Sequence, residues 1–179
     1  MENTEMVQRP GMVKTALIYG LLIGVLLILI QLVFYLSGGL TNIQATYVSY
    51  AVMLGGIILA TKARRNQDLG GYITYGQALG FGTLTIFFAS LLLSIYIFIF
   101  YKFIDPGAID LVIEAAENKM LDRNPNISDD ELDMALSISR YLIKPGFMAI
   151  SNIFNYTFLG FVMSLITSIF MKKENPDVI

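Results

Sequence analysis

The sequence predicts an all-α, single-domain protein that crosses a membrane four times and carries an amphipathic helical hairpin between the third and fourth crossings. Hydrophobic residues make up 55% of its 179 residues and charged residues 15%, whereas a typical soluble domain carries about 25% charged residues. Four long apolar segments contain no Asp, Glu, Lys or Arg, which is what insertion into a hydrocarbon core demands. The composition therefore excludes an ordinary soluble domain.

Each apolar segment is long enough to cross a hydrocarbon core of about 30 Å. The first has Gln31 as its only strongly polar side chain, and the second is the weakest because Gln44 and other polar residues lie near its start. The third is long enough to require a tilt or a protruding end. The first exceeds the apolar core of about 7–15 residues in a secretory signal, so we expect it to remain as a helix. The predicted spans are residues 15–36, 43–61, 75–101 and 146–171.

The basic residues outside the spans predict the orientation of the chain. They lie in the N-terminal tail, in the loop 62–72 and in the C-terminal tail, three regions on the same side of the membrane. By the positive-inside rule both termini are cytoplasmic, and the segment 105–144 lies outside. The basic residues of the loop also suit anionic lipid headgroups. The residues concerned are Arg9, Lys14, Lys62, Arg64, Arg65, Lys172 and Lys173.

The outer segment 105–144 holds nine acidic and four basic residues and is predicted to form two short amphipathic helices. Asp105 before a proline is typical of a helix start, and the Asn-Pro-Asn run at 124–126 breaks the first helix. Ser128 and Glu131 match a capping box at the start of the second. Neither helix could bury its apolar stripe alone. We expect the two to pack as a hairpin at the membrane surface, and a partner protein is the other way to cover the stripes.

Small residues recur four positions apart in three of the spans, a spacing that lets helix backbones approach closely. Such ladders fit packing within the four-helix bundle or a homodimer interface, and we favour packing within the bundle. The ladder residues are Gly20, Gly24, Gly76, Gly80, Gly160, Ser164 and Ser168.

A polar group lies early in the fourth span, formed by Ser151, Asn152 and Asn155. Buried amides need hydrogen-bond partners, so these side chains should face the bundle or the outer water. A substrate pocket is one interpretation. We favour hydrogen bonds between helices, with Ser90 or Ser94 of the third span as partners.

The sequence offers little for catalysis or metal binding. It has no histidine and no cysteine, which removes imidazole and thiolate chemistry. Oxygen ligands in 122–133 follow the spacing of a calcium loop, but Ile127 stands where that loop needs glycine. The acidic residues 129–133 suit helix capping better than acid–base catalysis. We therefore expect no metal, cofactor or enzymatic activity, and the net charge of −2 gives no reason to expect nucleic acid.

The segment 69–82, LGGYITYGQALGFG, follows the basic loop and the second span. Its GG-x-I-[ST]-[FY]-G signature resembles that of an uncharacterised family of four-span bacterial membrane proteins, the domain of unknown function 4199, common in Bacteroidetes-type genomes. The resemblance extends to the four-span layout and the acidic outer hairpin, and so to nearly the whole chain. It implies a small inner-membrane protein and supplies no activity. Locally, Gly70 and Gly71 predict a turn and Thr74 a helix cap.

These observations favour a multi-pass protein of the bacterial inner membrane with a non-catalytic, accessory role. Its acidic outer hairpin would meet a protein partner, and its other contacts would be the lipid bilayer and, in a homo-oligomer, its own copies. The alternative is a small transporter or channel subunit for a neutral solute, because ion transport usually leaves a charge inside the membrane. An enzyme acting on lipids comes third.

Overall fold

The structure, a computed structural model, describes residues 11–174, so that Arg9 lies outside the described residues. This part of the chain forms six α-helices and two π-helical turns, with one isolated β-bridge and no strand. The all-α prediction is therefore confirmed. The helices are α1 (Met12–Leu36), α2 (Ile43–Ala63), α3 (Tyr75–Ile99), α4 (Ala108–Arg123), α5 (Asp129–Leu142) and α6 (Pro145–Met171).

Four helices are long and apolar enough to cross a membrane, as predicted. They are α1, α6, α2 together with the π-helical turn Arg64–Asp68, and α3 together with the π-helical turn Phe100–Ile104. With 25 to 30 residues each, they extend about 37–45 Å at 1.5 Å per residue, more than the hydrocarbon core of about 30 Å. The protein is thus a multi-pass membrane protein whose helices protrude from the core or tilt within it.

The helix that begins as α2 continues further than predicted, so the expected loop at 62–72 is wrong in its first half. A π-helical turn at Arg64–Asp68 carries the chain beyond the apolar stretch. The predicted end followed the loss of hydrophobicity at Lys62. Helix formation depends instead on backbone hydrogen bonds, and lysine, arginine and glutamine are good helix formers.

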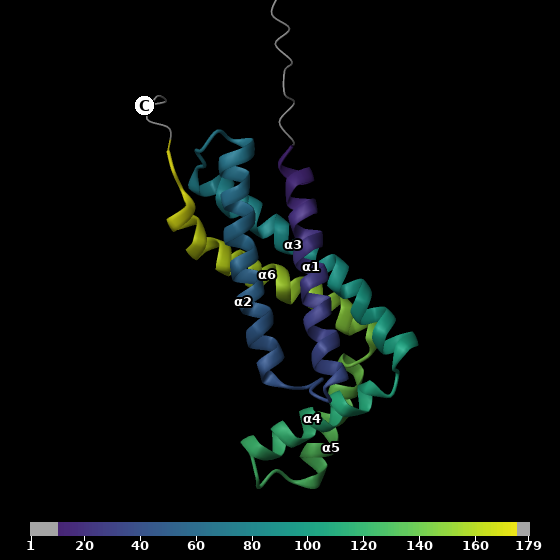
Figure 1. The fold of residues 1–179 in the computed structure, drawn as a ribbon. Helices are drawn as coiled ribbons and strands as arrows, with labels where there is room; N and C mark the ends of the chain where they lie inside the picture. Colours follow the sequence, from purple (N-terminus) through teal and green to yellow (C-terminus); the bar gives the residue numbers. More distant parts are fainter. Residues whose placement is uncertain (1–10, 175–179) are drawn as a thin grey trace, which may run out of the picture.

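Helix α3 is the centre of the bundle. In its most apolar stretch 44% of the residues are buried, against 22% in each of the other three spans. It packs most extensively against α6 and α1, and the pair α3 and α6 crosses α1 and α2 obliquely (Figure 1). The core between the helices is closely filled by the buried side chains of Ile23, Leu27, Met53, Ile57, Ile86 and Leu93.

Glycines make the closest contacts with α3. A Cβ atom at Gly20 would lie 2.6 Å from the Thr85 carbonyl oxygen, and one at Gly160 would lie 2.6 Å from Ile86 Cβ. A Cβ atom at Gly24 would lie 3.1 Å from the Ala89 carbonyl oxygen. These glycines allow α1 and α6 to approach α3.

The other ladder residues differ in their surroundings. Ser164 and Ser168 are buried, and the Ser164 hydroxyl faces Gly82 of α3, a glycine outside the predicted ladders. A Cβ atom at Gly76 would meet no described atom within 4 Å, and one at Gly80 would meet only Met12 Cε, at 3.4 Å. Gly76 and Gly80 therefore lie away from the close helix contacts of this chain.

Helices α4 and α5 form a hairpin that lies beyond one end of the bundle, below it in Figure 1. We call this the hairpin end, and the opposite end, where α1 begins and α6 finishes, the terminal end. Ser128 caps α5 in a capping box with Glu131, as predicted. Helix α4 begins at Ala108 rather than at the predicted Pro106, because a turn precedes it. The Asp105 carboxylate still accepts a hydrogen bond from the Ala108 amide at 3.2 Å.

Candidate functional site

The α4–α5 hairpin is the most polar structured surface of the described chain. Its two helices contact each other more extensively than either of them contacts a transmembrane helix. Leu136 is buried on the inner face of α5, whereas seven of the nine acidic side chains in 105–144 are exposed. Three of them, Asp129, Asp130 and Glu131, occupy the first turn of α5, where the helix dipole favours negative charge.

Helix α5 also has an apolar stripe that faces away from α4. Met134, Ile138 and Tyr141 are 66%, 56% and 63% exposed, and their spacing of four and three residues places them on one face. We refer to these three residues as the open stripe. Leu142, the last residue of α5, is 43% exposed as well. The hairpin thus buries one apolar face and leaves a second one uncovered.

The open stripe continues into the membrane-spanning helix α6. The rings of Tyr141 and Phe147 lie 6.4 Å apart, and Lys144 Nζ lies 4.7 Å from the centre of the Tyr141 ring. Basic residues therefore lie at the end of α5 that joins α6, while the acidic turn lies at the opposite end, next to the turn between α4 and α5. The charge of α5 is separated along its axis.

One hydrogen bond ties the start of the hairpin to α1. The Tyr35 hydroxyl donates to Asp105 Oδ2 at 2.8 Å, and the Tyr35 ring packs edge-on against Phe100 with centroids 4.8 Å apart. Asp105 uses its other carboxylate oxygen to cap the turn before α4. The same side chain therefore fixes both the exit of α3 and the position of the hairpin.

The polar residues of α6 are placed differently from one another. Asn152 Oδ1 accepts a hydrogen bond from the Ser94 hydroxyl of α3 at 3.2 Å, and Thr157 lies 3.3 Å from the Ser90 hydroxyl. Ser151 is half-buried and Asn155 is exposed. Asn152 thus makes a hydrogen bond between helices with Ser94, as expected from the sequence, whereas Asn155 takes no part in this bond.

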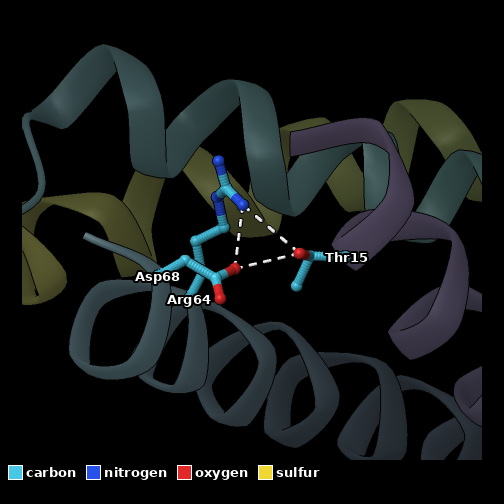
Figure 2. A network of polar contacts seen from close by, with 3 residues as sticks. All are labelled: Thr15, Arg64 and Asp68. Atoms are coloured by element: carbon cyan, nitrogen blue, oxygen red, sulfur yellow. Dashed lines mark hydrogen bonds and ion pairs between the residues drawn. The ribbon is translucent and has the colours of Figure 1, made fainter. Parts of the chain in front are cut away.

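The terminal end holds a buried polar network that the sequence does not reveal (Figure 2). Arg64 Nη1 lies 2.8 Å from Asp68 Oδ2, and the Thr15 hydroxyl of α1 donates to the same oxygen at 2.9 Å. All three residues are less than 10% exposed, and the guanidinium lies over the Phe81 ring of α3. The i,i+4 spacing of Arg64 and Asp68 was the available signal. It was missed because the segment was expected to be a loop.

Two further contacts close the terminal end. Ile73 and Lys173 pair through two backbone hydrogen bonds of 2.9 Å, which join the turn before α3 to the residues after α6. Arg65 Nη1 donates to the Met171 carbonyl oxygen at 3.2 Å. Polar contacts between distant segments therefore fix this end of the bundle.

No group of three or more acidic side chains within residues 11–174 is arranged to hold a metal ion. The calcium-like segment 122–133 instead forms the end of α4, a turn and the capped start of α5.

Comparison with known proteins gives one match. A family model described as a protein of unknown function, DUF4199, matches residues 18–173, which include most of the first span, the other three spans and the hairpin. No curated protein and no solved structure matches the chain.

Proposed function

Since this chain belongs to the DUF4199 family of proteins of unknown function, we propose from its geometry that it is a non-catalytic accessory protein of the bacterial inner membrane. Its hairpin binds a partner protein outside the cytoplasm. One observation carries the proposal. The open stripe of α5 is not covered by any other described helix, and it lies next to the exposed acidic turn at Asp129–Glu131. The complementary partner carries an apolar groove beside a basic surface.

The orientation in this proposal follows from the basic residues at the terminal end. Four lysines are exposed there, Lys14, Lys62, Lys172 and Lys173. Arg64 is buried and forms an ion pair with Asp68 inside the protein. The positive-inside rule places this end in the cytoplasm and the hairpin outside.

The orientation can be tested because the chain has no native cysteine. A single cysteine at Asn118 of α4 or at Asn66 beyond α2 would be exposed in either case. In intact cells, a membrane-impermeant thiol reagent is expected to label the Asn118→Cys variant and not the Asn66→Cys variant. After the cells are opened, both should react, which controls for accessibility. Labelling of Asn66→Cys alone in intact cells would place the hairpin in the cytoplasm and contradict the proposal.

Partner binding is tested with a photo-crosslinking amino acid at Met134, in the open stripe. Arg140 is the control position, because it is exposed on another face of α5. We expect a protein adduct from Met134 and not from Arg140. Changing Asp129→Asn together with Asp130→Asn should weaken capture about fivefold, since exposed charge pairs contribute about 0.2–1 kcal/mol each.

The matched control for this charge change is Asp110→Asn with Glu114→Gln, which removes two exposed charges from α4 instead. It should leave capture at Met134 unchanged. Circular dichroism must show the same helix content in both variants, because the α5 pair also stabilises the start of its helix. Adducts with lipid only, or equal loss in the two charge variants, would contradict binding through α5.

A further inference from the structure

A polar pocket of about 180 Å³ opens between the transmembrane helices at the hairpin end. Its wall comes from α1, the connection between α1 and α2, the first turns of α2, the π-helical turn after α3, and α6. Segments far apart in the sequence therefore meet here. The polar side chains that line it are those of Gln31, Thr41, Asn42, Thr46, Ser49, Tyr101 and Tyr156.

The inner side of the pocket is closed by the core of the bundle. Tyr101 and Tyr156 pack against the buried cluster that contains Leu27 and Met53, which are 1% and 0% exposed. The outer side is bordered by exposed residues of the α1–α2 connection, among them Asn42. The pocket is thus a dead-end recess that a solute can enter from the hairpin side.

The lining leaves hydrogen-bonding capacity unused. Asn42 Oδ1 accepts a bond from the Gln44 backbone amide, so the side-chain NH2 group of Asn42 remains available to donate. The Gln31 side chain, which lies within the apolar α1, makes no hydrogen bond to any other described residue. An amide inside a membrane helix is costly unless something pairs with it.

From this lining we infer that the pocket binds a small, uncharged, hydroxyl-rich ligand, a polyol or a sugar. No charged side chain lines the pocket, so an ionised ligand would be buried without a counter-charge. Amide and hydroxyl groups supply both donors and acceptors, and the Tyr101 and Tyr156 rings add apolar surface, the usual mixture in ligand sites. The volume equals that of about six water molecules and is below the range of about 300–1,000 Å³ for drug-sized ligands.

The same chemistry has two sources, a free solute and the headgroup of a neutral glycolipid. The intact protein in nanodiscs of phosphatidylethanolamine and phosphatidylglycerol distinguishes them by saturation-transfer NMR with glycerol, sorbitol and glucose. Saturable binding of one of these identifies a free solute. If none binds, nanodiscs that also contain monoglucosyl-diacylglycerol are tested for enrichment of this lipid around the protein. Glucuronate, the charged analogue of glucose, is expected not to bind.

Two variants make the test specific to the pocket. Gln31→Leu removes the unpaired amide, and the apolar replacement suits a membrane helix, so the fold should persist. It is expected to weaken binding at least tenfold. Gln44→Leu, which removes an exposed amide outside the pocket lining, should change nothing. The inference is overturned if neither the solutes nor the glycolipid bind, or if binding survives Gln31→Leu.

Discussion

Replacing Gly20 with alanine is expected to destabilise the bundle by about 1–3 kcal/mol, the usual cost of overpacking. The added methyl group would lie 2.6 Å from the Thr85 carbonyl oxygen and 2.7 Å from Phe88 Cβ. The Thr85 oxygen belongs to the backbone of α3, which cannot move aside by a rotamer change as a side chain can. Helices α1 and α3 must therefore separate along an extensive contact. Unfolding in bicelles with increasing dodecyl sulfate measures the change.

The control is the same substitution at Gly76, which belongs to an identical ladder spacing in the sequence. A Cβ atom there meets no described atom within 4 Å. Because alanine is favoured over glycine in a helix by about 1 kcal/mol, Gly76→Ala should be neutral or stabilising. Equal losses at both positions would show that Gly76 also lies in a close contact, such as one between two copies of the chain.

The second large effect is expected from Asp68→Ala. This change removes the carboxylate that Arg64 and Thr15 share and so takes a 2.8 Å ion-pair contact away from the buried guanidinium. Breaking a buried pair from one side costs about 3–5 kcal/mol. The pair retains slight exposure, so we expect a loss near the lower value. The same unfolding measurement in bicelles checks it.

The double variant Arg64→Met, Asp68→Leu separates loss of the pair from loss of packing. Replacing a buried ion pair with apolar side chains of similar volume is often neutral or stabilising. The double variant should therefore recover most of the stability lost in Asp68→Ala. If it is as unstable as the single variant, the ion pair itself provides the stability of the terminal end.

Features that depend on local sequence were predictable, and features that depend on distant contacts were not. The four spans follow from hydropathy, and the caps at Thr74 and Ser128 follow from residues three positions apart. The end of α2 was misplaced because hydropathy measures transfer into lipid rather than helix formation. The four-residue spacing of Gly20 and Gly24 is the same as that of Gly76 and Gly80, yet only the first pair lies in a close contact between two described helices.

The candidate sites show the same division. The amphipathic pattern of 105–144 predicts the hairpin, since each helix shows its apolar stripe in its own residues. It does not reveal that α5 keeps a second stripe open, because burial depends on how α4 and α5 meet. The pocket was missed for a similar reason. Gln31 is visible as the only strongly polar residue of its span, but Tyr101 and Tyr156 become its neighbours only after folding.

The pairing of Ile73 with Lys173 also bears on the order in which the protein is made. Lys173 is synthesised a hundred residues after Ile73. The two backbone hydrogen bonds between them can therefore form only when synthesis of the chain is almost complete. The same delay applies to the face of α3 that α6 covers. An intermediate with three inserted helices would expose Gly82 and Ile86 to lipid or to insertion factors. The last helix then completes both the bundle and its closure.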